Sequence, residues 1–260
     1  MTRFAATVAN ALGAEAPMQA DAPLPLVQRY LDRTLGAKAQ RALIFNPDCI
    51  GHWFWQKYSD LLTPVQEHAP LAVPLRTMMP SVTPVCFGTM YTGVMPAVHG
   101  IQRYEKPVIT VDSLFDSLPR SGKKVALLAA RDSSMSLIFG GRPVDSYILP
   151  YDDDVNVKAL ELIGQDIYDV VVVYNQSYDD MIHRTAPEAP EAMAAAEANV
   201  KAFDQLCEAA RAAWARYDSL FVWAPDHGNH VNWDGHGQHG EFREEDINVI
   251  HCFGAIPATR

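Results

Sequence analysis

Four short apolar runs, separated by segments with helical spacing, are the feature that most constrains the fold of this chain. They are ALIFN (42–46), VALLAA (125–130), DVVVVYN (169–175) and SLFVWAP (219–225). Apolar runs of this length without strict alternation are typical of strands that are buried on both faces. Strands that alternate with helices build βα units. The sequence therefore predicts an α/β fold with a mostly parallel central sheet and helices on both faces.

Two helices can be placed between these runs. Residues 191–217 carry apolar side chains at three- and four-residue steps, such as Val200 and Phe203, which indicates one long amphipathic helix. A second helix is expected to follow the aspartates at 152–154, because carboxylates complement the positive end of a helix. We interpret these three aspartates as a solvated helix cap and not as catalytic groups.

The chain shows no internal repeat or low-complexity linker, so we expect a single domain over residues 1–260, with residues 1–25 as a loosely held arm. No stretch approaches the roughly 20 apolar residues of a membrane span, and a signal-peptide core is lacking, which predicts a cytoplasmic protein. The formal net charge of -10 argues against a nucleic-acid scaffold or an anionic membrane as partner. An anionic substrate would have to be attracted locally, for example by bound cations.

Aspartates follow three of the four predicted strands. Asp48 comes two residues after the first run, Asp179 four residues after the third, and Asp226 directly after the fourth. In open α/β sheets the carboxyl ends of parallel strands meet at one edge, where ligands bind. One such aspartate alone is more often a turn residue. Several carboxylates at one edge repel one another unless cations neutralise them, so the set favours a metal site.

Histidines accompany these aspartates. His183 lies four residues after Asp179, a spacing that puts both on one face of a helical turn. The segment DHGNHVNWDGHGQHG (226–240) holds four of the nine histidines of the chain, namely His227, His230, His236 and His239. Mixed Asp and His shells suit zinc or manganese. Not all four histidines can be ligands, and the glycines predict a tightly turning backbone around the last two.

Thr83, within PSVTPVCFGTMYTG (80–93), is the candidate reacting group. Threonine is a good helix N-cap, Pro84 is favoured at the first helical position, and Gly93 is a typical helix end. Phosphate binds readily at such a positive helix end, because free N–H groups and the helix dipole both favour an anion. Taken alone, Thr83 is better explained as a simple cap, so a nucleophilic role depends on the metal site.

In order and spacing, these segments resemble the alkaline phosphatase superfamily, in particular its nucleotide pyrophosphatase and phosphodiesterase branch. The resemblance covers most of the chain and is carried by NPDCIG, SVTPVCFGTMYTG with VHGI, YDDMIH, PDHG and the final HG before EFREEDINVIHCFG. It implies an alkaline phosphatase-like fold with a minimal cap, since only residues 100–165 leave room for an insertion. It also implies a hydrolase that acts on phosphoric ester bonds of a small substrate.

The resemblance further implies two divalent cations, with zinc preferred and manganese or magnesium as alternatives. The implied ligands are Asp179, His183 and His239 for one cation, and Asp48, Asp226, His227 and the Thr83 oxygen for the other. Thr83 would then be the catalytic nucleophile, and the reaction would pass through a phosphothreonine that water hydrolyses.

Cys86 departs from the phosphodiesterase branch, which places an asparagine three residues after the nucleophile to bind a phosphoryl oxygen. A thiol is a poor donor, so either a backbone N–H of the helix start binds this oxygen or the substrate differs. The sulfatase branch uses a modified cysteine in a C-x-P-x-R context, whereas CFGTM follows here. A phosphomutase of the same superfamily and a catalytically silent metal-binding protein remain alternatives. Cys49, directly after Asp48, is a candidate metal ligand, but we interpret it as a small packed residue.

Overall fold

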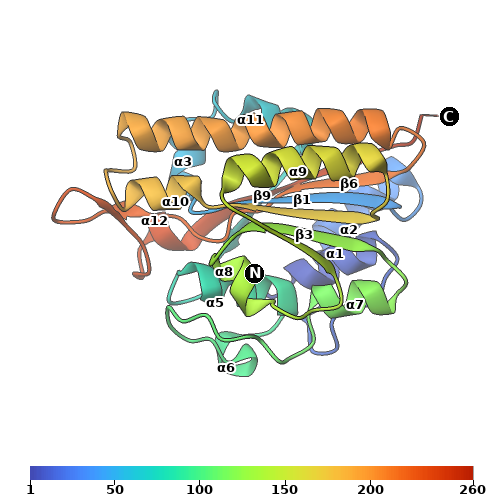
Figure 1. The fold of residues 1–260 in the computed structure, drawn as a ribbon, viewed down its shortest axis with the longest axis horizontal. Helices are drawn as coiled ribbons and strands as arrows, with labels where there is room; N and C mark the ends of the chain where they lie inside the picture. The colour runs from blue at the N-terminus through green and yellow to red at the C-terminus, as the bar shows by residue number, and fades with distance from the viewer. Residues whose placement is uncertain (260) are drawn as a thin grey trace.

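The computed structural model describes residues 1–259 and confirms the predicted α/β fold (Figure 1). Seven strands form one sheet in the order β2-β9-β6-β1-β5-β3-β4, and β9 alone runs antiparallel to its neighbours. The strands of this sheet are β1 (Arg41–Pro47), β2 (Leu71–Arg76), β3 (Val125–Ala130), β4 (Asp145–Leu149), β5 (Val170–Asn175), β6 (Ser219–Trp223) and β9 (Asn248–Ile256). A small ribbon of β7 (His230–Val231) and β8 (Gly237–Gln238) lies outside it.

Helices cover both faces of the sheet (Figure 1). One face is covered by α3 (His52–Lys57), α4 (Thr63–His68), α9 (Asp152–Gln165), α10 (Ser177–Ile182) and α11 (Pro190–Ala213). The other face carries α1 (Phe4–Ala11), α2 (Pro25–Leu35), α5 (Thr83–Thr92), α6 (Pro96–His99), α7 (Leu114–Arg120) and α8 (Ser134–Ile138). The short α12 (Glu244–Ile247) leads into β9.

The strands are buried on both faces, as their unbroken apolar runs predict. In β5, Val170 and Val172 pack into the core beneath α1, α5 and α7, whereas Val171 and Val173 pack into the core beneath α9 and α11. Successive side chains of a strand point to opposite faces, so a central strand needs apolar residues at every position. The two cores fix the register of the central strands and thereby the relative positions of their carboxyl ends.

The start of the chain differs from the expected loose arm. Phe4 and Val8 of α1 are buried, and the Phe4 ring packs edge-on against Tyr91 of α5 with ring centroids 5.7 Å apart. Residues 13–24 have no helix or strand and are mostly exposed. The Ala-rich composition suggested a mobile segment. Small side chains instead let the first helix approach α5 closely and bury its apolar surface.

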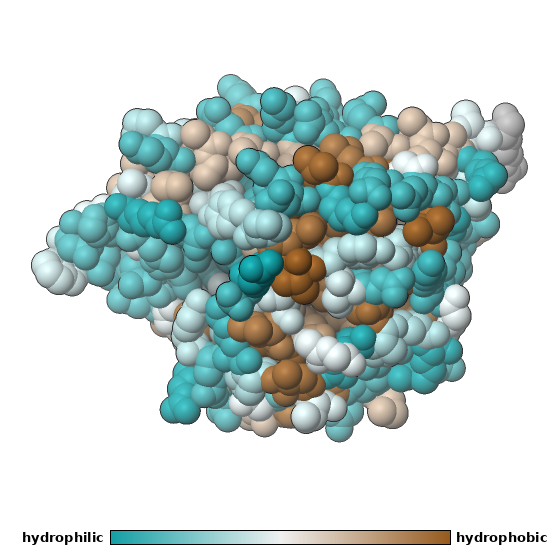
Figure 2. Space-filling view, in the orientation of Figure 1, coloured by the Kyte–Doolittle hydropathy of each residue, from teal (hydrophilic) through white to brown (hydrophobic). Residues whose placement is uncertain are grey.

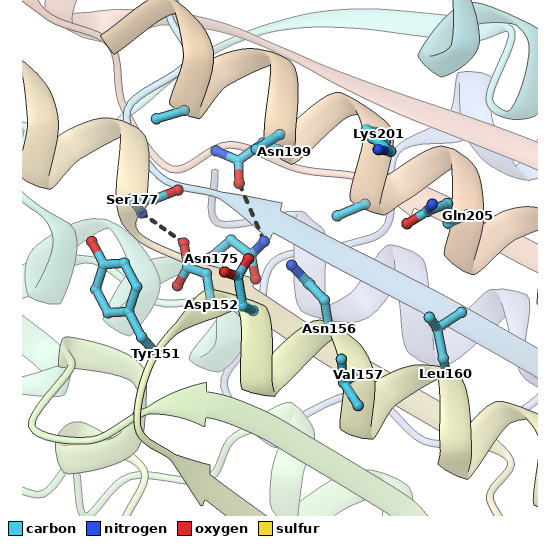
Figure 3. A pocket seen from close by; sticks show the side chains of 14 residues that line it. Tyr151, Asp152, Asn156, Val157, Leu160, Asn175, Ser177, Asn199, Lys201 and Gln205 are labelled. Atoms are coloured by element: carbon cyan, nitrogen blue, oxygen red, sulfur yellow. Dashed lines mark hydrogen bonds between the residues drawn. The ribbon is translucent and has the colours of Figure 1, made fainter. Parts of the chain in front are cut away.

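Asp152 corrects the expectation that all three aspartates of the α9 start are solvated. Asp153 and Asp154 are exposed, but Asp152 is buried. Its carboxylate accepts the backbone N–H of Gln176 at 3.1 Å and that of Ser177 at 2.7 Å, the latter drawn in Figure 3. It therefore ties the start of α9 to the turn between β5 and α10. This turn borders a cavity of about 500 Å³ between α9 and α11.

Most of residues 100–165 lie in α7, β3, α8, β4 and α9, which belong to the central layers, so the cap is minimal, as expected. The orange-red loop between β6 and α12 projects from one edge of the molecule (Figure 1), and the visible face is largely hydrophilic with scattered apolar patches (Figure 2). Within residues 1–259, no helix is both long and apolar enough to cross a bilayer.

Candidate metal centre

Three neighbouring strands deliver the aspartates to one edge of the sheet. Asp48 follows β1, Asp226 lies just beyond β6, and Asp179 lies in α10, which follows β5. β1 pairs with both β5 and β6 in parallel, so the three strands end together. The backbone N–H of Asp48 also donates to the carbonyl oxygen of Asn175 at 2.9 Å. The parallel topology thus brings three aspartates that are far apart in the sequence to one edge of the sheet.

One group of side chains forms around His227. Its Nε2 lies 3.4 Å from Asp48 Oδ1 and 3.3 Å from Asp226 Oδ2, and all three side chains are buried. Thr83 Oγ1 lies 3.2 Å from the same nitrogen and 3.5 Å from Asp48 Oδ2. Four possible ligand atoms, from the residue after β1, the start of α5 and the loop after β6, therefore converge on one small volume.

A second group forms around Asp179. Its Oδ1 lies 3.5 Å from His183 Nε2 and 3.3 Å from His239 Nε2, and the two nitrogens are 3.1 Å apart. The structure places His239 in this group, whereas His236 is exposed and lies near Asp234. His230 is not in either group, because its Nδ1 pairs with Asp246 Oδ1 at 2.7 Å. The His227 and His239 rings stack with centroids 4.1 Å apart, so the two groups adjoin.

The three histidines are held in one tautomer. In each of them a backbone carbonyl oxygen lies at hydrogen-bond distance from Nδ1. The carbonyl oxygen of Gly237 lies 3.2 Å from His183 Nδ1, that of Gly228 lies 3.1 Å from His227 Nδ1, and that of Ser81 lies 2.9 Å from His239 Nδ1. An Nδ1–H that donates to a carbonyl leaves the Nε2 lone pair free. In each case the free nitrogen faces the shared centre. Two such lone pairs 3.1 Å apart repel one another unless a cation or proton lies between them.

In Asp48 and Asp226, likewise, one carboxylate oxygen accepts a hydrogen bond and the other accepts none. Asp48 Oδ2 accepts the Tyr174 hydroxyl, and Asp226 Oδ1 accepts the backbone N–H of Cys49 at 3.2 Å. Asp48 Oδ1, Asp226 Oδ2 and Asp179 Oδ1 have no hydrogen-bond partner among residues 1–259. Bare carboxylate oxygens are costly to bury. Together with the free imidazole nitrogens, they make the two groups fit divalent cations with nitrogen and oxygen ligands.

Without cations, the centre retains protons. Burial raises the pKa of Asp226 to about 7, and burial with repulsion from Asp226 raises the pKa of Asp48 well above its usual range. Burial also lowers the pKa of His227 well below 6.5, and the nearby His239 adds to this. Burial alone would lower the pKa of His239, but attraction to Asp179 raises it to about 9. Burial alone would raise the pKa of Asp179, but His239 and His183 hold it well below its usual range.

These shifts predict how metal affinity depends on pH. Ligand atoms must be deprotonated, so His239 and Asp226 have to release protons when a cation binds. We expect the apparent zinc affinity to rise between about pH 7 and pH 9, with a net release of protons to the buffer. Calorimetric titrations in two buffers of different ionisation enthalpy would measure this release. An affinity that is constant over this range would contradict the assigned protonation states.

Thr83 occupies a different helix position from the one predicted. The observed N-cap is Val82, and α5 begins at Thr83. The observed cap is therefore one residue before the predicted cap, Thr83. The hydrogen-bond partners of the Thr83 hydroxyl are Asp48 Oδ2 and His227 Nε2, so it does not cap the helix. A capping hydroxyl would not be free to face these two residues. The predicted helix end is confirmed at Gly93, whose φ of 77° lies in the left-handed region.

Three residues that support the site carried no signal in the sequence. Tyr174 lies within an apolar strand, yet its hydroxyl holds Asp48. Ser81 holds the His239 loop through its carbonyl oxygen and through Oγ, which accepts the Gly240 N–H at 3.1 Å. The Thr77 hydroxyl donates to the carbonyl oxygen of Asp226 at 2.6 Å and lies 2.9 Å from Cys86 Sγ. The Cys86 thiol is thus buried against Thr77.

No protein-family model matches the sequence, and no curated protein matches it significantly. Similar solved structures exist at low identity. Murine ectonucleotide pyrophosphatase/phosphodiesterase 5, an inactive form in complex with AMP, superposes with a TM-score of 0.60 at 14% identity over 74% of this chain and 58% of that one. A 2-O GAG sulfatase gives 0.58 at 12% identity over 84% and 64% of the two chains.

Phosphonoacetate hydrolase from Sinorhizobium meliloti, in complex with phosphonoformate, gives a TM-score of 0.55 at 16% identity over 76% of this chain and 59% of that one. The chain thus spans about three-fifths of the length of these neighbours. The shared features are the central sheet and the helices on both of its faces. The chain therefore has the fold of the alkaline phosphatase superfamily.

Proposed function

We propose that this protein is a metal-dependent phosphoester hydrolase in which Thr83 is the nucleophile at a centre for two divalent cations, with zinc preferred. The observation that carries the proposal is the place of Thr83 Oγ1, 3.2 Å from His227 Nε2 and 3.5 Å from Asp48 Oδ2. A threonine hydroxyl that faces a free imidazole nitrogen and a carboxylate with one bare oxygen is suited to attack an electrophile.

The fold neighbours support the same chemistry. One neighbour is named as a nucleotide pyrophosphatase/phosphodiesterase and is bound to AMP, and another is a phosphonate hydrolase bound to phosphonoformate. Both names point to small ligands with a phosphorus centre. We infer a small phosphoester as the substrate of this chain. The protein's negative formal charge makes local cations the main attraction for such an anion.

We assign the following roles to the residues of the site. Asp179, His183 and His239 would hold one cation, and Asp48, Asp226 and His227 would hold the other. Bound cations at these positions would favour ionisation of the Thr83 hydroxyl and neutralise charge on the phosphoryl oxygens. Thr83 attacks phosphorus in line and expels the alcohol, and water then hydrolyses the phosphothreonine. Tyr174 fixes the orientation of Asp48, and the start of α5 presents its positive end to the phosphoryl group.

The proposal can be tested with protein that has been stripped by a chelator and reloaded with zinc, manganese or magnesium. Aryl phosphate monoesters and diesters with the same leaving group should be hydrolysed only by reloaded protein. The matched aryl sulfate is the control, and it should react far more slowly because an unmodified threonine replaces the modified cysteine of the sulfatase branch. Full activity in the stripped protein, or none with any of the three metals, would reject the proposal.

The minimal cap leads to an expectation about substrate size. Because the helices and strands of residues 114–165 belong to the central layers, few elements remain to enclose a substrate. We expect kcat/KM for a small and a bulky ester of equal leaving group to agree within about tenfold. A kinetic comparison of methyl and nucleoside aryl phosphodiesters would measure this ratio. A strong preference for the large nucleotide would show that the chain encloses its substrate after all.

A further inference from the structure

Cys49 lies directly after the metal-site residue Asp48 and has an unusual backbone. Its φ is 71°, in the left-handed region that residues other than glycine, asparagine and aspartate rarely adopt. The surrounding groups hold it there: its N–H donates to Asp226 Oδ1 at 3.2 Å, and its carbonyl oxygen accepts Asn229 Nδ2 at 2.8 Å. Strain that is maintained at one residue of a site suggests that its side chain has a function.

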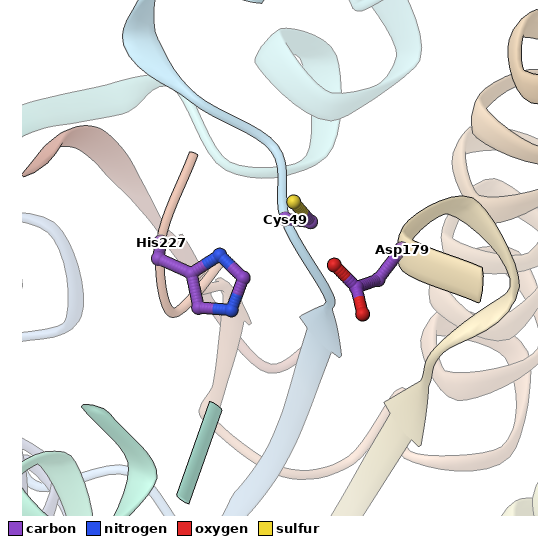
Figure 4. Close-up of side chains that lie close together, drawn as sticks. All are labelled: Cys49, Asp179 and His227. Atoms are coloured by element: carbon purple, nitrogen blue, oxygen red, sulfur yellow. The ribbon is translucent and has the colours of Figure 1, made fainter. Parts of the chain in front are cut away.

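The Cys49 sulfur lies beside the junction of the two ligand groups. Cys49 Sγ, a ring nitrogen of His227 and a carboxylate oxygen of Asp179 all lie within 4.8 Å of one another (Figure 4). Asp179 belongs to one group and His227 to the other. The sulfur is fully buried: Asn229 Nδ2 donates to it at 3.5 Å, and the thiol donates to the carbonyl oxygen of Gly228 at 3.6 Å. Imidazole and carboxylate beside a sulfur make an incomplete metal shell.

We propose that Cys49 Sγ is a ligand of the metal centre and binds as a thiolate beside Asp179 and His227. The inference rests on the proposed function, because it requires cations at the two ligand groups. As the sulfur–metal bond forms, the thiol proton leaves to solvent, so no oxidant or reductant is involved. A sulfur ligand favours zinc, cobalt or cadmium over magnesium and manganese. This preference gives the centre a selectivity that its oxygen and nitrogen ligands alone would not provide.

Cobalt(II) is the probe that tests the proposal. Stripped protein titrated with cobalt(II) should show visible d–d bands that report binding and, in addition, a near-ultraviolet sulfur-to-cobalt charge-transfer band. Cys49→Gly removes the sulfur and suits the positive φ, so the variant is expected to fold. It should keep the d–d bands and lose the charge-transfer band. Its zinc affinity should fall at least about tenfold, while its manganese affinity stays nearly the same.

Cys86→Ser is the matched control, because Cys86 is another buried thiol near the site but contacts Thr77. Its spectrum should equal that of the parent protein. X-ray absorption of the zinc-loaded parent gives a second measurement that needs no variant, and it should detect sulfur in the zinc shell. Cobalt d–d bands without charge transfer, or charge transfer that persists in Cys49→Gly, would refute the Cys49 ligand alone. Failure to bind cobalt at all would refute the metal centre as well.

Discussion

Thr83→Ala is expected to lower kcat for phosphoester hydrolysis by at least about 10³-fold, because no other hydroxyl replaces the proposed nucleophile at this place. Both proposed cations should remain bound, since the six aspartate and histidine residues proposed as their ligands are unchanged. The helix should persist too, because the Thr83 hydroxyl bonds to Asp48 and His227 and not to the helix backbone. Steady-state kinetics with metal analysis of the same samples would check all three expectations.

Two further variants separate nucleophilic from structural effects. Thr83→Ser retains a hydroxyl and should recover a large part of the activity. Thr89→Ala is a control in the same helix, because the Thr89 hydroxyl lies 3.1 Å from His99 Nε2 and contacts neither ligand group. It should retain activity. Acid quenching of the parent with labelled substrate should trap phosphate on Thr83. Undiminished turnover by Thr83→Ala would remove this residue from the mechanism.

Removal of the cations is expected to have the largest effect on stability. A ligand present at about 1,000 times its Kd stabilises the folded state by about 4 kcal/mol per site, so chelation should lower Tm by about 10 °C or more for a chain of this size. In the metal-free protein, buried carboxylate oxygens of the centre lack hydrogen-bond partners, and only retained protons offset their charge. Differential scanning calorimetry before and after chelation would measure the shift.

This Tm difference should grow with pH. Asp226 and His239 have folded-state pKa values of about 7 and about 9, raised above 3.8 and 6.5. A raised pKa stabilises the fold below the unfolded value, and this contribution is lost as pH rises through the folded value. Metal-free protein should therefore become less stable from about pH 6 to pH 9. Cations replace these protons, so loaded protein should change little. An equal Tm decrease in both forms would contradict this account.

The sequence alone determined the elements and their order. The four predicted strands match β1, β3, β5 and β6, because strands buried on both faces must be apolar at every position. The long helix at 191–217 matches α11, which ends at Ala213, because helical spacing of apolar residues is a local property. The aspartates after strands were recognisable for the same reason, since their chain positions follow directly from the strand ends.

Only the tertiary structure decided how these groups meet. It brought His239 and not His236 beside Asp179, left Asp152 buried against the β5–α10 turn, and packed residues 4–11 against α5. It also showed that Tyr174 holds Asp48 and that backbone carbonyls fix the three imidazoles. These contacts join segments as much as 158 residues apart. Local patterns carry no information on them, because they depend on how the sheet order and loop paths place distant residues together.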